Sequence, residues 1–142
     1  MKVIFDSKDK SVVVVGKGEE FISTITKFAK ERDVSFTFSM IGGASSVDIA
    51  FFDMNEKKYI TKNFLPGFSK NIEIVTVTGN VAWYEGEPMV HAHGIFSNEE
   101  YQSFNGHIMK IMISITAETM INWLPKKIER QFEEETCLKL LK

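Results

Sequence analysis

The sequence predicts a single α+β domain, with one long amphipathic helix packed on a mainly antiparallel or mixed β-sheet. The chain has 142 residues, 44% of them hydrophobic, which suits one domain with a proper core. One segment has the apolar spacing of a helix, and roughly seven have the spacing or composition of strands. Most of these strands follow one another directly, so a doubly wound parallel sheet is not expected.

The helix is predicted over residues 19–32. Its apolar residues recur with helical spacing and form one stripe: Phe21, Ile22, Ile25, Phe28 and Ala29. Glu19 and Glu20 fall in its expected first turn, and basic residues fall near its end. Both placements are favourable for the helix dipole. We therefore expect this helix to pack its apolar stripe on the sheet.

Strands are predicted over residues 12–15, 36–40, 47–52, 59–63, 72–78, 81–84, 89–96 and 108–116. Gly42–Gly43 is expected to interrupt the second and third of them, and Gly79–Asn80 to end the fifth. A turn is expected at Pro66–Gly67. The apolar pattern shifts by one residue after Ile74, which indicates a β-bulge.

The C-terminal third of the chain is less clearly patterned. Residues 108–116 are almost continuously apolar, which predicts a central strand covered on both faces. Residues 117–124 fit either a short helix or a continuation of that strand. Residues 132–141 mix charge with leucine, and their secondary structure stays open.

Charge and composition limit the function classes. The net charge is −2, and the chain has two arginines, Arg32 and Arg130. A duplex-DNA binder usually needs a basic face and uses arginine to contact guanine, so autonomous DNA binding has little support. The single cysteine, Cys137, excludes an intramolecular disulfide. No apolar run approaches the roughly 20 residues of a membrane helix, and no secretory signal is recognised, so a cytoplasmic protein is expected.

All three histidines lie in one short stretch of the chain, at His91, His93 and His107. Residues i and i+2 of a strand point to the same face, so His91 and His93 should project side by side. An imidazole from a neighbouring strand could complete a three-nitrogen metal site with one open position, as in catalytic zinc centres. A solvent-facing polar pair or a subunit contact is the alternative.

The order of motifs closely resembles that of the plants-and-prokaryotes-conserved (PPC) domain family. A Gly-Glu start with its helix is followed by the turn at 41–44, the strand at 70–80, His91-Ala92-His93, and Asn105-Gly106-His107-Ile108. The resemblance identifies residues 1–142 as one PPC-like domain, with its core at about 10–140. It is similar to the prokaryotic stand-alone type.

The resemblance implies a mainly antiparallel α/β domain that assembles as a homotrimer. It also implies that His91, His93 and His107 share a pocket able to hold a divalent transition metal such as zinc. Prokaryotic members are often labelled DNA-binding. Plant members carry an arginine in a partner-binding stretch, where this chain has Asn71, and an arginine-rich hook for the minor groove that this chain lacks.

Glu73 and Glu118 are the candidate catalytic residues. A strand carboxylate near the histidines could serve as a ligand, an orienting partner or a general base. The alternative is a polar side chain facing solvent or a subunit neighbour.

Three functional hypotheses follow. The first is a homotrimeric regulatory protein whose histidine pocket holds a metal or small ligand. The second is a metal-dependent enzyme of hydrolase or lyase type that uses the open metal position. The third, DNA binding, rests on the family label alone.

Overall fold

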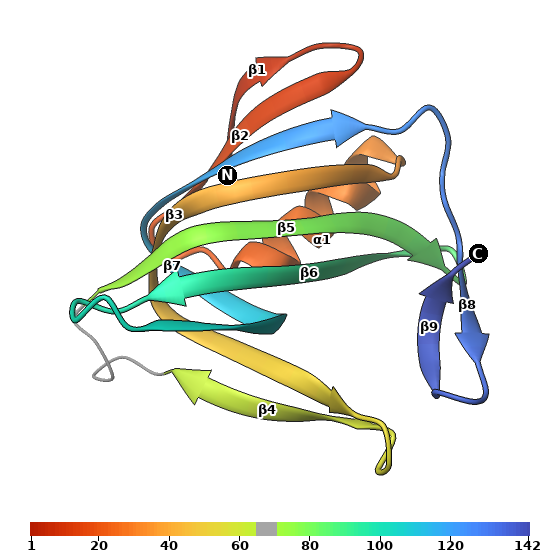
Figure 1. Cartoon of the computed structure of the whole chain (residues 1–142). Helices are drawn as coiled ribbons and strands as arrows, with labels where there is room; N and C mark the ends of the chain where they lie inside the picture. The colour runs from red at the N-terminus through yellow and green to blue at the C-terminus, as the bar shows by residue number, and fades with distance from the viewer. Residues whose placement is uncertain (65–70) are drawn as a thin grey trace.

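The computed structural model describes residues 1–64 and 71–142, which form one α-helix and nine β-strands (Figure 1). The elements are β1 (Lys2–Asp6), β2 (Lys10–Gly16), α1 (Phe21–Arg32), β3 (Phe36–Asp53), β4 (Lys58–Phe64), β5 (Ile72–Tyr84), β6 (Glu87–Ser97), β7 (Ser103–Trp123), β8 (Arg130–Glu133) and β9 (Leu138–Leu141). The turn expected at Pro66–Gly67 lies outside the described residues. The α+β class, with one helix and a mainly antiparallel sheet, is confirmed.

Seven strands form one antiparallel sheet in the order β1-β2-β7-β6-β5-β3-β4. β7 also pairs with β3, so the pairings run from β3 through β5, β6 and β7 back to β3. This ring of hydrogen-bonded strands curls the sheet around a hydrophobic interior. β8 and β9 form a separate two-stranded hairpin beside the ends of β5 and β6 (Figure 1).

Several strands are longer than the sequence pattern predicted. Gly42–Gly43 does not interrupt the chain: β3 continues through it as one strand with irregular register. β5 likewise continues through Gly79–Asn80. Both predicted breaks are wrong because these glycines lie where neighbouring atoms approach the backbone closely, not in turns. The bulge expected after Ile74 is confirmed by a register shift there, and residues 117–123 continue β7 as a strand.

Helix α1 is fixed to the sheet by the residue that caps its N-terminus, Glu20. The Glu20 side chain caps the helix by accepting hydrogen bonds from the backbone N–H groups of Ile22 and Ser23, at 2.9 and 2.7 Å. The same carboxylate accepts from the backbone N–H of Ile111 on β7, at 3.2 Å. The helix therefore begins after the two glutamates, and the prediction that they occupy its first turn is wrong.

The apolar stripe of α1 is buried in the core as predicted. Phe21, Ile25 and Ala29 are fully buried, and Phe28 is nearly so. Phe21 contacts Phe38 of β3, with ring centroids 5.6 Å apart. The helix contacts β6 and β7, so it covers the inner face of the strands that carry the histidines.

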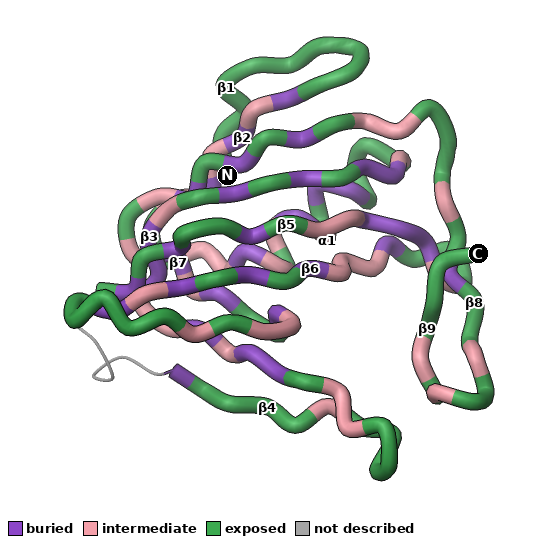
Figure 2. Tube along the Cα trace, in the orientation of Figure 1, coloured by how far each residue is buried: buried purple, intermediate pink, exposed green. Residues whose placement is uncertain are grey.

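The outer face of the sheet is open in the single chain. Buried and exposed residues alternate along much of the strands (Figure 2). The prediction that residues 108–116 are covered on both faces is wrong for the single chain. Met109 and Ile115 are 44% and 67% exposed, because α1 covers one face alone. Within the described residues, no helix is long and apolar enough to cross a membrane.

Gly42 lies where β3 and β7 approach closely, and this contact yields a stability prediction. A Cβ at Gly42 would lie 2.1 Å from the Thr116 carbonyl oxygen, and its φ of 157° is one that other residues rarely adopt. We expect Gly42→Ala to destabilise the protein by about 2 kcal/mol or more, because the backbone atoms must separate. Urea unfolding measures this loss.

Gly16→Ala is the matched control, since the nearest atom to its Cβ is a side-chain atom, Glu19 Oε2, at 3.2 Å and not backbone. Equal free energies of unfolding for the two variants would show that the β3–β7 contact does not require glycine.

Candidate metal centre

Three imidazoles converge on the outer face of the sheet. His91 and His93 lie two residues apart on β6, and His107 lies on β7 directly opposite His93 in the antiparallel register. His107 Nδ1 and His93 Nε2 are 3.4 Å apart, and one ring nitrogen from each histidine lies within 4.8 Å of the others. The sequence prediction that the three side chains would meet is therefore confirmed.

Strand register brings the histidines together, and a glycine keeps His91 in place. On β5, Asn80 lies opposite His91 and Thr78 lies opposite His93. A Cβ at Gly79, between them, would lie 2.4 Å from the His91 carbonyl oxygen. A larger residue at 79 would thus displace the strand that carries the first two histidines.

The surroundings favour neutral imidazoles. Burial, followed by the positive charge of its neighbours His91, His93 and Arg130, lowers the pKa of His107 to about 4. The pKa of His91 is also lowered, first by burial and then by Arg130 and His93. Both rings are therefore uncharged at neutral pH, which is the form that binds a metal.

Tyr59 of β4 orients the third histidine. Its ring stacks on His107 with centroids 4.5 Å apart and an interplanar angle of 24°. Burial raises the pKa of Tyr59, so the phenol stays protonated at neutral pH. A stacked, protonated tyrosine limits rotation of His107 without adding a charge to the cluster.

A cavity of about 390 Å³ opens beside His91 and His107. Tyr59, Arg130 and the β9 residues Leu138 and Lys139 also line it. Arg130 is one of the two arginines of the chain, but no sequence pattern connects it with the histidines. No periodicity could have done so, because the connection depends on how the C-terminal hairpin folds back on the sheet.

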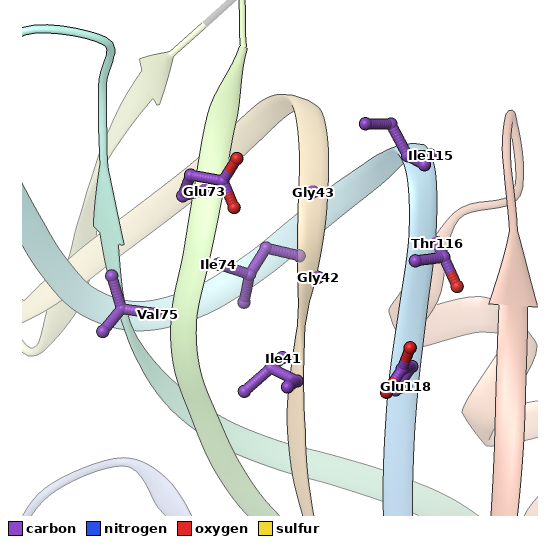
Figure 3. A pocket seen from close by; sticks show the side chains of 9 residues that line it. All are labelled: Ile41, Gly42, Gly43, Glu73, Ile74, Val75, Ile115, Thr116 and Glu118. Atoms are coloured by element: carbon purple, nitrogen blue, oxygen red, sulfur yellow. The ribbon is translucent and has the colours of Figure 1, made fainter.

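Glu73 and Glu118 lie in a different cavity, of about 430 Å³ (Figure 3). Glu73 is on β5 and Glu118 on β7, and β3 passes between them with Gly42 and Gly43 (Figure 3). Glu73 pairs with Ser97, four residues along β6 from His93, which corresponds to roughly 13 Å of strand. Within one chain, neither carboxylate lines the histidine cavity, and a catalytic role for either stays a prediction.

The cluster has the donor set of a transition-metal centre. Two nitrogens bound to one tetrahedral zinc at about 2.0–2.1 Å would be about 3.3 Å apart. The His93–His107 separation of 3.4 Å is close to this value. Imidazole ligands suit zinc, copper, iron and nickel. Three protein ligands would leave a further coordination position for a small ligand.

The fold and the site together define the class of protein. It is an antiparallel α+β domain with a three-histidine cluster on its outer face. The model of the Plants and Prokaryotes Conserved (PCC) domain, the PPC family under another abbreviation, matches residues 5–125. The chain belongs to this family, which confirms the resemblance found in the sequence.

Solved structures share the fold over nearly the whole chain. A "putative dna binding protein" from Bacteroides thetaiotaomicron is 20% identical, with a TM-score of 0.91, and the match covers 99% of this chain and 96% of that one. A metal-containing protein from Archaeoglobus fulgidus is 23% identical, with a TM-score of 0.84 and coverage of 100% and 99%.

A PPC protein from Pyrococcus horikoshii is 27% identical, with a TM-score of 0.84 and coverage of 94% and 90%. A search of curated proteins finds no match.

Proposed function

We propose that this chain is a homotrimeric PPC protein with a regulatory or partner-binding role, whose histidine cluster holds a divalent transition metal. The observation that carries the proposal is the convergence of His91, His93 and His107 on one face. Their nitrogens are close enough to share one ion. At least two of the three rings are held neutral by their surroundings.

Zinc is the metal we favour. Three neutral imidazoles add no charge and fit a tetrahedral ion that keeps one open position. The Archaeoglobus fulgidus protein of the same fold is described as metal-containing, which supports a metal in this chain as well. Among the described residues, no carboxylate or thiol belongs to the cluster.

The homotrimer is supported by the open face of the sheet. Ile41, Val75 and Ile115 line one cavity there and are 51%, 51% and 67% exposed. Burying these side chains against other subunits would contribute about 25 cal/mol for each Å² of apolar surface removed from water. Burial in a trimer would also explain why residues 108–116 of β7 are apolar on both faces.

A metal-dependent hydrolase or lyase is the second candidate. The open metal position and the adjacent cavity favour it, since bound water or substrate could occupy both. Glu73 and Glu118 are its candidate bases, although each would need to reach the cluster from another subunit. If the native protein shows a measurable turnover that the His91→Ala/His93→Ala variant lacks, this function is supported over a binding role.

Direct DNA binding is the third candidate, and it rests on the description of the Bacteroides thetaiotaomicron relative. The net charge of −2 does not favour it. A mobility shift of duplex DNA that weakens steeply with salt would support it. Absence of a shift at low salt would exclude it.

The metal proposal predicts near-stoichiometric zinc in the purified protein. We expect the double variant His91→Ala/His93→Ala to contain none, because a single imidazole remains. Elemental analysis measures the content. Zinc at 100 times its dissociation constant should also stabilise the native protein by about 2.7 kcal/mol.

Thr78→Ala is the control for that experiment, since Thr78 lies opposite His93 but offers no imidazole. It should retain the metal. If zinc is equally absent from native protein and double variant, the metal proposal fails.

The trimer proposal predicts a sedimentation mass of three times 16.2 kDa. We expect Ile115→Lys to dissociate the assembly, because it places a charge at a buried apolar contact. Ile60→Lys, at a 41% exposed position on β4, is the control and should leave the mass unchanged. A native protein that sediments as a monomer at micromolar concentration would contradict the trimer.

A further inference from the structure

Arg130 is a buried cation without a buried anion to balance it. The residue is 7% exposed. It donates from one Nη to Asn80 Oδ1 at 2.7 Å and from the other to the Lys139 carbonyl oxygen at 3.0 Å. Its Nε is buried and has no hydrogen-bond partner in the part of the chain that the structure describes. Within that part, no carboxylate forms a salt bridge with it.

This environment is costly for a guanidinium group. Arginine has five N–H donors, and the two hydrogen bonds above use neutral oxygens and account for two of them. A buried charge is normally paired, because desolvation costs several kcal/mol that only a good partner offsets. The structure therefore shows a site of uncompensated positive charge that an anion would stabilise.

Arg130 lies beside the histidine cluster. Arg130 lines the same cavity as His91 and His107, and its charge lowers the pKa of both. The cavity has a largely apolar lining from Ile22, Met89, Val90, Ile108, Met109, Leu138 and Leu140. A ligand there meets Arg130, Lys139, neutral imidazoles and hydrocarbon.

We propose that Arg130 forms an anion subsite next to the histidine cluster, and that the site binds a small monocarboxylate with an apolar body. The carboxylate would accept hydrogen bonds from Arg130 and turn an oxygen toward the metal. This assignment rests on the proposed metal site and names the ligand class for it. It applies equally to a bound regulator and to a substrate.

The guanidinium group and the apolar lining together suit a carboxylate with a hydrocarbon body. A planar guanidinium can form two parallel hydrogen bonds with a carboxylate, and the apolar side chains around it can contact the rest of the ligand. Lys139, the other cation that lines the cavity, has its Nζ over the ring of Tyr84 at 4.2 Å. Lys139 is thus engaged with an aromatic ring, which leaves Arg130 as the cation that holds the ligand.

The test is calorimetric titration of the zinc-loaded trimer with butyrate and with butyramide, its uncharged analogue of similar shape. We expect butyrate to bind and butyramide to bind at least tenfold more weakly. Arg130→Gln should weaken butyrate binding by about 10- to 100-fold, as expected for loss of a charge-assisted hydrogen bond. Arg130→Lys, which keeps the charge, should recover part of the affinity.

Arg32→Gln is the matched control, because it removes the other arginine of the chain, which pairs with Asp6 and does not line this cavity. It should change butyrate affinity less than twofold. Circular dichroism and zinc content identify variants in which the hairpin or the metal has been lost. Butyrate binding that is absent, or equal in the native protein and a folded, zinc-containing Arg130→Gln, overturns the subsite and leaves the metal site intact.

A native protein that binds no zinc overturns the proposed metal site instead. Titration of the zinc-free protein then decides the anion subsite. Butyrate binding that depends on Arg130 would retain it without the metal, and absence of binding would end it.

Discussion

The pairing of β3 with β7 is the constraint on which the rest of this structure depends. These two long strands are joined over residues 36–50 and 107–123, and each also pairs with other strands on its far side. Because β3 and β7 each pair with strands on both sides, they close the ring through β5 and β6 and give the sheet its curvature. Gly42 permits the close approach, since no Cβ fits against the Thr116 carbonyl. The enclosed interior is then filled by α1.

The histidine cluster is a direct result of this closure. β7 must lie beside β6 at residues 103–107 before it pairs with β3, and that position sets His107 opposite His93. The inner face of β6 is occupied by small or apolar residues such as Ala92 and Gly94. The alternating residues His91 and His93 consequently point to the outer face. Backbone hydrogen bonds between the strands thus determine the geometry of the cluster. They hold the three imidazoles close together without an ion pair among the described residues.

Much of the fold and the His91–His93 pair could be predicted from the sequence, because both depend on short-range patterns. The place of His107 beside them depends on strand pairing, and the family resemblance supplied it. The helix follows from its apolar spacing, and the paired histidines follow from the two-residue period of a strand. The wrongly predicted strand breaks have one physical origin. Gly42–Gly43 and Gly79 were interpreted as breaks, whereas they serve contacts between strands distant in sequence. Glu73 and Glu118 could not be placed either, since their distance from the histidines depends on the register of several strands.

Arg130 shows where sequence patterns stop being informative. It follows the segment matched by the family model and lies two residues before the stretch, residues 132–141, whose secondary structure the sequence left open. Its burial depends on the β8–β9 hairpin folding back so that Asn80 of β5 accepts from the guanidinium. The same contact places a positive charge beside rings that would otherwise accept protons readily. Arg130 therefore acts on the cluster even without a ligand: it favours neutral imidazoles, and neutral imidazoles are a requirement for metal binding. A metal bound there would raise the positive charge further. The two cationic centres together then make an anion the most favourable third component of the site.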